Sequence, residues 1–548
     1  MVGFRRQRPL LGSKKPDAGR DTVAAMDRRD FLAATAAVAA APLASGAGNS
    51  GSKAKFTLEE ITLEEIAAAI ADGRVSSRRV TEMYIARIDT LDHRGPMLRA
   101  VLEINPRALD IAADLDRERA ATGTRGPLHG VPVLIKDNVE TADRMMTTAG
   151  SHALDGWYAP TDAALVARLR AAGAVILGKT NLSEWANFRS THSVSGWSAR
   201  GGQTRNPYAR DRTPSGSSSG SAVAVAANLC AIAVGTETDG SIVSPASVNG
   251  IVGLKPTVGL VSRSGIVPIA HSQDTAGPLT RSVRDAAVML SVMASLDPSD
   301  PASVAVGDRF ERDYLRFVDI DGLRGARLGI ARRFFADNAA LDLFLDRCVG
   351  ILKDAGAVIV DPADLPMHGA AVAAEQEVLL YEFKAGLNAY LARLPASFPV
   401  RSLTELIRYN ATHAADEMPL FQQELLLQAE AKGSLEEAAY RDARSTCLNV
   451  TRAGGIDAVL SEHRLDAIVS LTQGAPWLID PVNGDSDSGG CSSPPAIAGY
   501  PHITVPAGSH RGLPIGLSFF GTAFAEPTLI RLAAGFEHVA HGRTPPFL

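Results

Sequence analysis

The chain has 548 residues, of which 46% are hydrophobic and 21% are charged, and its net charge is -5 at pH 7. This composition is globular and provides material for a large core. Length alone suggests three or four domains, but residues 56–548 contain no linker rich in proline or charge, so we expect one large domain there.

The chain has four cysteines, and they are widely separated in the sequence: Cys230, Cys348, Cys447 and Cys491. They form no CxxC motif and no cluster with histidines at the spacing of a zinc site, so a metal site is not expected. The spacing leaves undecided whether one or two disulfides form, although unpaired buried thiols are the favoured interpretation.

The first residues have the pattern of an export signal. A basic stretch leads to Arg28-Arg29, an apolar run spans 33–43, and small residues follow at 45–47. This pattern predicts a twin-arginine signal over 1–47, a linker over 48–55, and a periplasmic or secreted protein. The alternative is a disordered basic tail with a stray helix. Either Met1 or Met26 can be the true start.

The apolar run at 33–43 is too short and too rich in alanine for a stable membrane span. Loss of residues 1–47 would leave a net charge of -9, because that segment holds eight basic and four acidic residues. Such an acidic protein is not built to hold nucleic acid or an anionic membrane surface. The oligomeric state is left open, and a monomer is compatible with the sequence.

The first elements predicted after the N-terminal segment are helices, over residues 62–122. Thr62 to Glu65 forms a capping box at the start of a helix that ends at Gly73. Apolar residues three or four apart over 80–91 predict a second helix, and 105–122 is expected to be a solvated helix. We expect these helices to pack on one face of the domain.

A strand–helix–strand pattern follows over 130–135, 161–172 and 174–177, with continuous apolar runs in both strands. This order is typical of an α/β sheet that is covered on both faces. Lys136 directly follows the first strand, and ligands of such sheets bind outside the carboxyl ends of the strands.

Residues 213–255 contain two loops rich in small and hydroxyl residues, at 215–221 and 235–241. Between them, 222–228 is predicted to be a buried helix and 231–234 a strand. Loops of this kind let the backbone approach a ligand closely.

The remaining chain continues the α/β pattern and adds a helical stretch. Strands are predicted at 328–330, 357–360, 467–471, 503–506 and 514–520, and helices at 341–355 and 528–538. Helical patterns at 375–394, 403–410, 420–431 and 436–448 indicate a mainly helical insertion or cap at about 370–457. The predicted fold is α/β, with a large mixed, mostly doubly covered sheet flanked by helices.

Amide hydrolysis requires a nucleophile, a base and donors for the oxyanion. Ser217 and Ser241 come from the two hydroxyl-rich loops. Lys136 follows three apolar residues, and burial would keep its amine neutral enough to act as a base. The backbone N–H groups of Thr238, Asp239, Gly240 and Ser241 are predicted to form the oxyanion hole.

The sequence resembles the amidase signature family over about residues 56–548. The matching segments are 130–138, 147–151, 178–181, 215–221, 235–241 and 250–257. The resemblance implies the amidase signature fold, Ser241 as nucleophile, Ser217 as a bridging serine after a cis bond from Gly216, and Lys136 as base. It implies no metal or cofactor.

Within this family the sequence is most similar to bacterial peptide amidases, which remove the C-terminal amide of peptides. The supporting segments are 183–189, 195–208, 381–387 and 236–241, where Asp239 replaces the glycine of most family members. Ser244 stands where some members that bind carboxylates have an arginine. The resemblance implies release of ammonia from peptide amides or other small amides. The alternatives are a broad-specificity amidase and the glutaminase subunit of an amidotransferase.

Other patterns compete with this interpretation. Residues 216–220 match the G-x-S-x-G elbow, which would make Ser218 a nucleophile, but that elbow needs a preceding strand. Ser241, His271 and Asp274 could form a serine triad, although Asp274 is favoured as an acceptor for loop N–H groups.

Further polar and aromatic residues are assigned supporting roles. Lys179 is expected to be a charge at the rim of the site. Ser218, Asp137 and Asn138 are expected to support the loops or bind substrate. Trp185 and Trp197 either line the pocket or fill the core.

Overall fold

The fold is built on an 11-stranded sheet, in which the neighbouring strands follow the order β1-β3-β2-β6-β8-β7-β12-β13-β11-β9-β10. This computed structural model describes residues 56–335, 338–366, 369–486 and 489–548, and Phe56–Leu548 forms one unit. The export signal predicted at 1–47 and the linker at 48–55 lie outside the described residues.

The strands of this sheet have the following bounds: β1 Val101–Ile104, β2 Pro132–Lys136, β3 Val175–Thr180, β6 Ile232–Glu237, β7 Val252–Lys255, β8 Thr275–Thr280, β9 Arg327–Ile330, β10 Val358–Val360, β11 Ala467–Leu471, β12 His502–His510 and β13 Leu513–Phe520. Strand β2 is parallel to β3 and β6, and β9 is parallel to β10 and β11. The other pairings are antiparallel. The predicted large mixed sheet is therefore confirmed.

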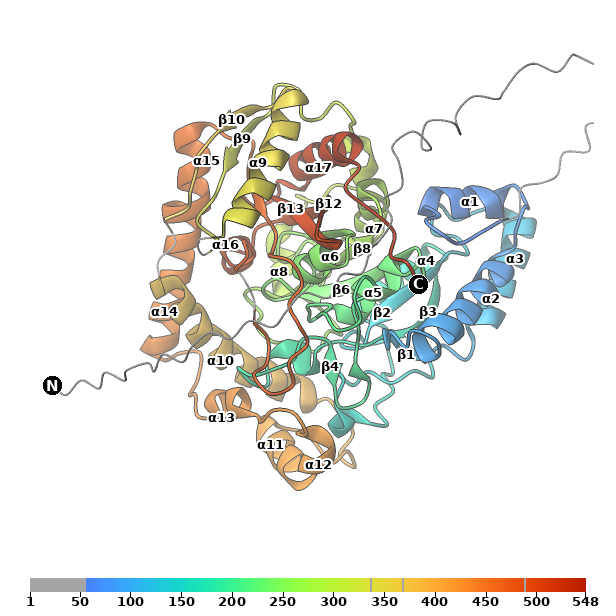
Figure 1. Ribbon diagram of the computed structural model, residues 1–548. Helices are drawn as coiled ribbons and strands as arrows, with labels where there is room; N and C mark the ends of the chain where they lie inside the picture. The colour runs from blue at the N-terminus through green and yellow to red at the C-terminus, as the bar shows by residue number, and fades with distance from the viewer. Residues whose placement is uncertain (1–55, 336–337, 367–368, 487–488) are drawn as a thin grey trace, which may run out of the picture. The chain divides into compact units, whose positions relative to one another are not determined.

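Helices flank the sheet on both faces (Figure 1). Their bounds outside the helical region are α1 Leu63–Ala71, α2 Ser77–Arg87, α3 Ala108–Thr122, α4 Ala164–Ala171, α5 Ser219–Ala226, α6 Val243–Val248, α7 Val283–Met293, α8 Pro301–Val306, α9 Ala339–Asp354, α16 Ser493–Ala498 and α17 Glu526–Ala540. The predicted capping box is present, because Thr62 Oγ1 accepts from Glu65 N and the Glu65 carboxylate accepts from Thr62 N.

Between β10 and β11 the chain is mainly helical. This helical region comprises α10 Gly369–Leu391, α11 Leu403–Thr412, α12 Ala414–Glu417, α13 Glu424–Glu430, α14 Ala438–Thr451 and α15 Asp457–His463. Helices α10 to α13 lie together at the bottom of Figure 1. A hydrophobic cluster that includes Trp185, Phe188, Phe383 and Leu387 packs this region against the loops after β3.

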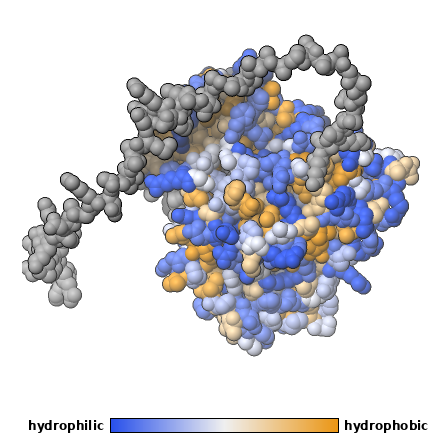
Figure 2. Space-filling model, turned by 45° about the vertical axis from the view of Figure 1, so that its right-hand side comes forward, coloured by the Kyte–Doolittle hydropathy of each residue, from blue (hydrophilic) through white to orange (hydrophobic). Residues whose placement is uncertain are grey.

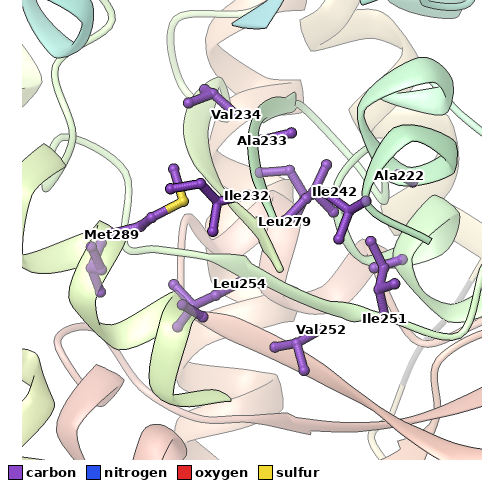
Figure 3. Close-up of a cluster of buried hydrophobic side chains, with 14 of the residues drawn as sticks. Ala222, Ile232, Ala233, Val234, Ile242, Ile251, Val252, Leu254, Leu279 and Met289 are labelled. Atoms are coloured by element: carbon purple, nitrogen blue, oxygen red, sulfur yellow. The ribbon is translucent and has the colours of Figure 1, made fainter. Parts of the chain in front are cut away.

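The main core lies under the two hydroxyl-rich loops. Figure 3 shows side chains from α5, β6, β7 and β8 converging there, among them Ile232, Val234, Leu254 and Leu279. All four are at most 1% exposed, and each such side chain contributes roughly 1.5–3 kcal/mol of transfer free energy. This packing holds the strand ends that carry the loops in fixed positions.

The surface is mixed in polarity. On the face seen in Figure 2, hydrophobic residues are scattered among hydrophilic ones. No helix within the described ranges has the length and apolar character needed to cross a membrane. All four cysteines are buried and unpaired, as the favoured interpretation of their spacing expects.

Candidate active site

Lys136 is the last residue of β2, between β3 and β6. Its side chain is completely buried. Three consecutive apolar residues suit β2 to a buried position inside the sheet, and the pairing of Ile135 with Val234 places the end of β2 beside the second half of β6. The lysine therefore lies at the carboxyl edge of parallel strands, where ligands bind in such sheets.

The amine of Lys136 contacts three oxygen atoms. Its Nζ lies 2.8 Å from Ser217 Oγ, 2.9 Å from Thr236 Oγ1 and 3.2 Å from the Thr236 carbonyl oxygen. The structure thus brings together two of the predicted residues, Lys136 and Ser217, although they are 81 positions apart in the sequence.

Burial lowers the pKa of Lys136 from 10.5 to about 7, because the ammonium form loses its hydration. The carboxyl groups of Glu237 and Asp274 oppose this shift more weakly. Lys136 therefore exchanges a proton near neutral pH, which an ordinary lysine does not do.

The other serines of the first loop are engaged in holding the start of α5. Ser218 Oγ donates to the Thr236 carbonyl oxygen at 2.9 Å, Ser219 Oγ to that of Ser215 at 2.6 Å, and Ser221 Oγ to that of Val234 at 2.9 Å. Ser217 is the member of this group whose hydroxyl contacts the lysine.

The backbone around Ser217 is tightly constrained. The bond between Gly216 and Ser217 is cis, as the resemblance implies. A Cβ on Gly216 would lie 2.2 Å from Ser183 Oγ, so only glycine fits without displacing the Ser183 side chain. Ser183 N also donates to the Ser217 carbonyl oxygen at 3.1 Å.

Ser241 lies beside Ser217. The N–H of Ser218 donates to the Ser241 carbonyl oxygen at 3.1 Å, which joins the two hydroxyl-rich loops. Ser241 is 8% exposed. Its Oγ makes no hydrogen bond within the described part of the chain.

The loop 238–241 is closed by Glu237, a residue that the sequence analysis did not single out. Glu237 Oε2 accepts from the N–H groups of Ile242 at 2.8 Å and Val243 at 3.1 Å, at the start of α6. An acidic residue shortly before a short apolar helix is a usable sequence signal for such a cap.

The N–H groups of the predicted oxyanion hole are available as donors. Among the described residues, no acceptor takes the backbone N–H of Thr238, Asp239, Gly240 or Ser241. Gly240 has φ 75°, in the left-handed region that glycine adopts without strain. Unpaired N–H groups in a mostly buried loop are rare and indicate a place for an anionic or carbonyl oxygen.

Asp274 holds this loop and is not part of a triad. Its carboxylate accepts from Thr238 Oγ1 at 2.6 Å and from the N–H groups of Ile269 and Ala270, each at 2.9 Å. His271 instead faces Glu382, with 3.4 Å between Nδ1 and Oε2. The role of Asp274 as an acceptor for loop N–H groups is confirmed.

The elbow at 216–220 also lacks its structural context. Residues 204–215, which precede Ser218, form turns and loops and contain no strand. Ser218 Oγ is directed at the backbone of Thr236, so its hydroxyl supports the loop.

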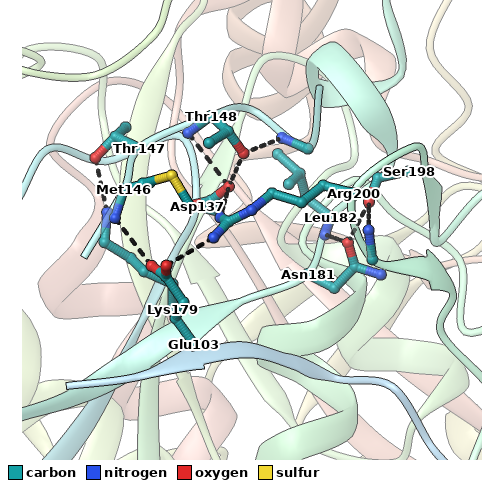
Figure 4. Close-up of polar contacts among 12 residues, drawn as sticks. Glu103, Asp137, Met146, Thr147, Thr148, Lys179, Asn181, Leu182, Ser198 and Arg200 are labelled. Carbon is teal, nitrogen blue, oxygen red and sulfur yellow. Dashed lines mark hydrogen bonds and ion pairs between the residues drawn. The ribbon is translucent and has the colours of Figure 1, made fainter. Parts of the chain in front are cut away.

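A buried network of charged groups surrounds the residue after Lys136 (Figure 4). The Asp137 carboxylate accepts from the N–H and hydroxyl of Thr148 and pairs with Arg200 at 3.5 Å. Lys179 donates to Thr147 Oγ1 at 2.8 Å and to the Val139 carbonyl oxygen at 2.7 Å. The expectation that Lys179 lies at the rim is wrong, because this side chain is fully buried.

The two tryptophans fill hydrophobic clusters next to the helical region. Trp185 is 2% exposed and packs in the cluster with Phe383. Trp197 is 8% exposed and lies edge-on to Phe421, with 5.2 Å between the ring centroids. Arg189 lies over the Phe421 ring and donates to the Glu417 carbonyl oxygen. These contacts join the helical region to the loops beside the site.

Thr236 is the main site residue that the sequence analysis missed. Its Oγ1 contacts Lys136 and also accepts from Asn138 Nδ2 at 3.0 Å, which gives Asn138 a supporting role. Thr236 lies inside a buried strand, where a threonine has no local feature that distinguishes it from a core residue. It can be found only through contacts between distant segments.

Replacing Thr236 by valine should lower kcat/KM for the expected amide hydrolysis about 10- to 100-fold, because Lys136 loses one of its acceptors while the shape of the site is kept. The half-maximal pH of the activity should also fall below that of the wild type, since an acceptor stabilises the ammonium form. Thr280→Val, which removes a buried hydroxyl that donates to Ser282, is the control. An unchanged pH profile in Thr236→Val would contradict the contact.

The chain is similar to known proteins over most of its length. The family model described as Amidase matches residues 79–530. A solved native peptide amidase from Stenotrophomonas maltophilia is 51% identical, covers 90% of this chain and 99% of its own, and superposes with a TM-score of 0.86.

Two curated relatives show the breadth of the similarity. A probable amidase of Arabidopsis thaliana is 44% identical over 503 residues, which are 90% of this chain and 92% of the relative. A glutamyl-tRNA(Gln) amidotransferase subunit from Roseiflexus is 34% identical over 506 residues, which are 89% of this chain and 98% of the relative.

Proposed function

Since this chain belongs to the amidase signature family and is an amidase hydrolase, we propose that it releases ammonia from C-terminal peptide amides through an acyl-enzyme on Ser241. The observation that carries this proposal is the buried contact of 2.8 Å between Lys136 Nζ and Ser217 Oγ, beside Ser241.

The three contacts of Lys136 can also be kept by a neutral amine, if it accepts from Ser217. A neutral amine has two N–H groups and one lone pair. The Thr236 carbonyl oxygen can only accept, and Thr236 Oγ1 can accept the second N–H. The lone pair is then left for the hydroxyl hydrogen of Ser217.

In the first half of the reaction, Ser241 Oγ attacks the amide carbon and passes its proton to Ser217 Oγ, which passes its own to Lys136. The N–H groups of residues 238–241 stabilise the oxyanion. Lys136 then returns the proton through Ser217 to the leaving nitrogen, the C–N bond breaks and ammonia departs.

In the second half, water attacks the ester on Ser241 and gives a proton to the same relay. The proton returns to Ser241 Oγ as the ester C–O bond breaks, and the carboxylic acid product is released. Lys136 and Ser217 thus act as base and acid in turn, which requires the pKa of the lysine to lie near the working pH.

Similarity to the peptide amidase supports peptide amides as the substrate class, because 51% identity extends over 90% of this chain. Ser244 adds a chemical argument, since it offers no cation to anchor a free carboxylate. A broad-specificity amidase on small amides is the second candidate. Similarity to the amidotransferase makes glutamine a third substrate to test.

The deciding experiment measures ammonia release by the purified chain from four groups of compounds: peptides with a C-terminal amide, small aliphatic and aryl amides, glutamine, and the corresponding free peptides. We expect the highest kcat/KM for peptide amides and none for free peptides. Equal or higher kcat/KM for small amides would replace the proposal by the broad-specificity one. Glutamine as the best substrate would favour a glutaminase.

We also propose that residues 26–47 direct export through Arg28 and Arg29. These residues, fused to a reporter together with 48–50, should place it outside the cytoplasm, and replacing both arginines by lysine should retain it inside. Retention of the unaltered fusion in the cytoplasm would refute export.

A further inference from the structure

A cavity of about 410 Å³ lies outside the site described above, between α8, α14 and the residues that follow α16. The residues of its lining that matter here are Ser272, Arg309, Arg444, Arg452 and Tyr500. Three of the fourteen lining residues carry a guanidinium group. From this charge and the unmet hydrogen-bond capacity around it, we infer that the cavity is a binding site for a small doubly charged oxyanion of the sulfate or phosphate class.

Arg444 is the clearest indication of a ligand. Its residue lines the cavity, yet within the described ranges it forms neither a hydrogen bond nor an ion pair, and its Nη1 is buried without a partner. A buried donor without an acceptor costs about 1–3 kcal/mol, and more when it is charged. A guanidinium has five N–H donors, and an oxyanion accepts two of them at once.

The other two arginines use only part of their donors on the protein. Arg452 Nε donates to the Ala498 carbonyl oxygen at 2.9 Å, and Arg309 Nε to that of Val306 at 2.9 Å. Neither forms an ion pair with a described carboxylate. Arg309 Nη2 also donates to the Ala305 carbonyl oxygen, and the guanidinium groups of Arg309 and Arg452 lie over the rings of Phe524 and Tyr500. Both therefore keep a positive charge at the cavity, and burial together with Arg452 lowers the pKa of Arg444.

Two carboxylates near the lining residues do not neutralise the cavity: Glu382, and Asp457, whose Oδ2 accepts from Tyr500 Oη at 2.7 Å. Glu382 is fully buried and accepts from Ser272 N at 2.9 Å and from Tyr440 Oη at 2.7 Å. It attracts Arg444 electrostatically but makes no contact with it. With three guanidinium groups and these two carboxylates, a positive charge remains at the cavity, and a tetrahedral dianion offers acceptors to more than one guanidinium group.

A second polar atom of the lining residues also lacks a partner. Ser272 Oγ is buried and unpaired among the described residues. A hydroxyl can donate to an oxyanion. The next residue, Gln273, donates to the Thr238 carbonyl oxygen at 3.3 Å, so the cavity borders the segment that holds the proposed oxyanion loop.

The test is isothermal titration of the full chain with inorganic sulfate at constant ionic strength. We expect saturable binding of one sulfate per chain, at least about tenfold weaker in Arg444→Gln, since a charge-assisted bond is lost. Arg441→Gln is the matched control, because Arg441 lies on the same helix and is 62% exposed, and its affinity should be unchanged. Ser241→Ala should bind sulfate like the wild type, which separates this site from the proposed catalytic one.

Three results would overturn the inference: no saturable sulfate binding by the wild type, equal affinity in a folded Arg444→Gln, or acetate binding as tightly as sulfate. The unfolding midpoint without sulfate shows whether Arg444→Gln is folded. If it is not, Ser272→Ala decides, with several-fold weaker binding expected and unchanged affinity counting against the site.

Discussion

Ser241→Ala should reduce kcat on a peptide amide by at least about 10⁴-fold while the unfolding midpoint stays that of the wild type. Removal of a nucleophile leaves only the contribution of oxyanion binding and substrate positioning. The fold should be unaffected because Ser241 Oγ makes no hydrogen bond in the described part of the chain, while the backbone contact from Ser218 N remains.

The matched control for this variant is Ser244→Ala, one turn further along at the start of α6 and 9% exposed. It removes a hydroxyl from the same segment and should retain activity within about tenfold of the wild type. If purified Ser241→Ala keeps activity in that range, Ser241 is not the nucleophile and the proposed acyl-enzyme is wrong.

Lys136→Met should be about as inactive as Ser241→Ala, because Ser217 would lose the base that takes its proton. In the wild type, kcat/KM should be half-maximal near pH 7, level above pH 8, and fall tenfold for each unit below pH 6. This direction follows from the requirement for the neutral amine, whose pKa is about 7. A steady rate from pH 5 to pH 9 would exclude Lys136 as the base.

The same lysine predicts a pH dependence of stability that does not rely on turnover. In the folded chain its pKa is about 7, whereas its ordinary value is 10.5. Between these values unfolding takes up a proton, so the free energy of unfolding of the wild type should rise with pH relative to Lys136→Met. The slope is at most about 1.4 kcal/mol per pH unit. Parallel curves for the two proteins from pH 7 to pH 10 would show that the lysine is charged when folded.

Most of the sheet was predictable because its strands are continuous apolar runs. Strands β2, β3, β6 and β11 were all expected close to their observed positions. Strand β8 was not expected, because Thr275–Thr280 contains a glycine and a proline and has neither alternation nor an apolar run. It forms through pairing with β6 and β7, which local propensity does not encode.

The chemistry of the site was visible in the sequence because it depends on residue types at the ends of predicted elements. A lysine directly after a buried strand and two loops of small hydroxyl residues are local features, as are the long ordered motifs. They were sufficient to indicate Lys136, Ser217 and Ser241 as a set.

Only the tertiary structure decided which partner each hydroxyl group contacts and how far the pKa of the lysine is lowered. Ser217 contacts Lys136 while Ser218, Ser219 and Ser221 bond to backbone carbonyl oxygens, a difference invisible in a run of similar residues. Thr236 reaches Lys136 across 100 positions. The lowered pKa of the lysine arises from complete burial, and burial is a property of packing between distant segments that no short stretch of sequence contains.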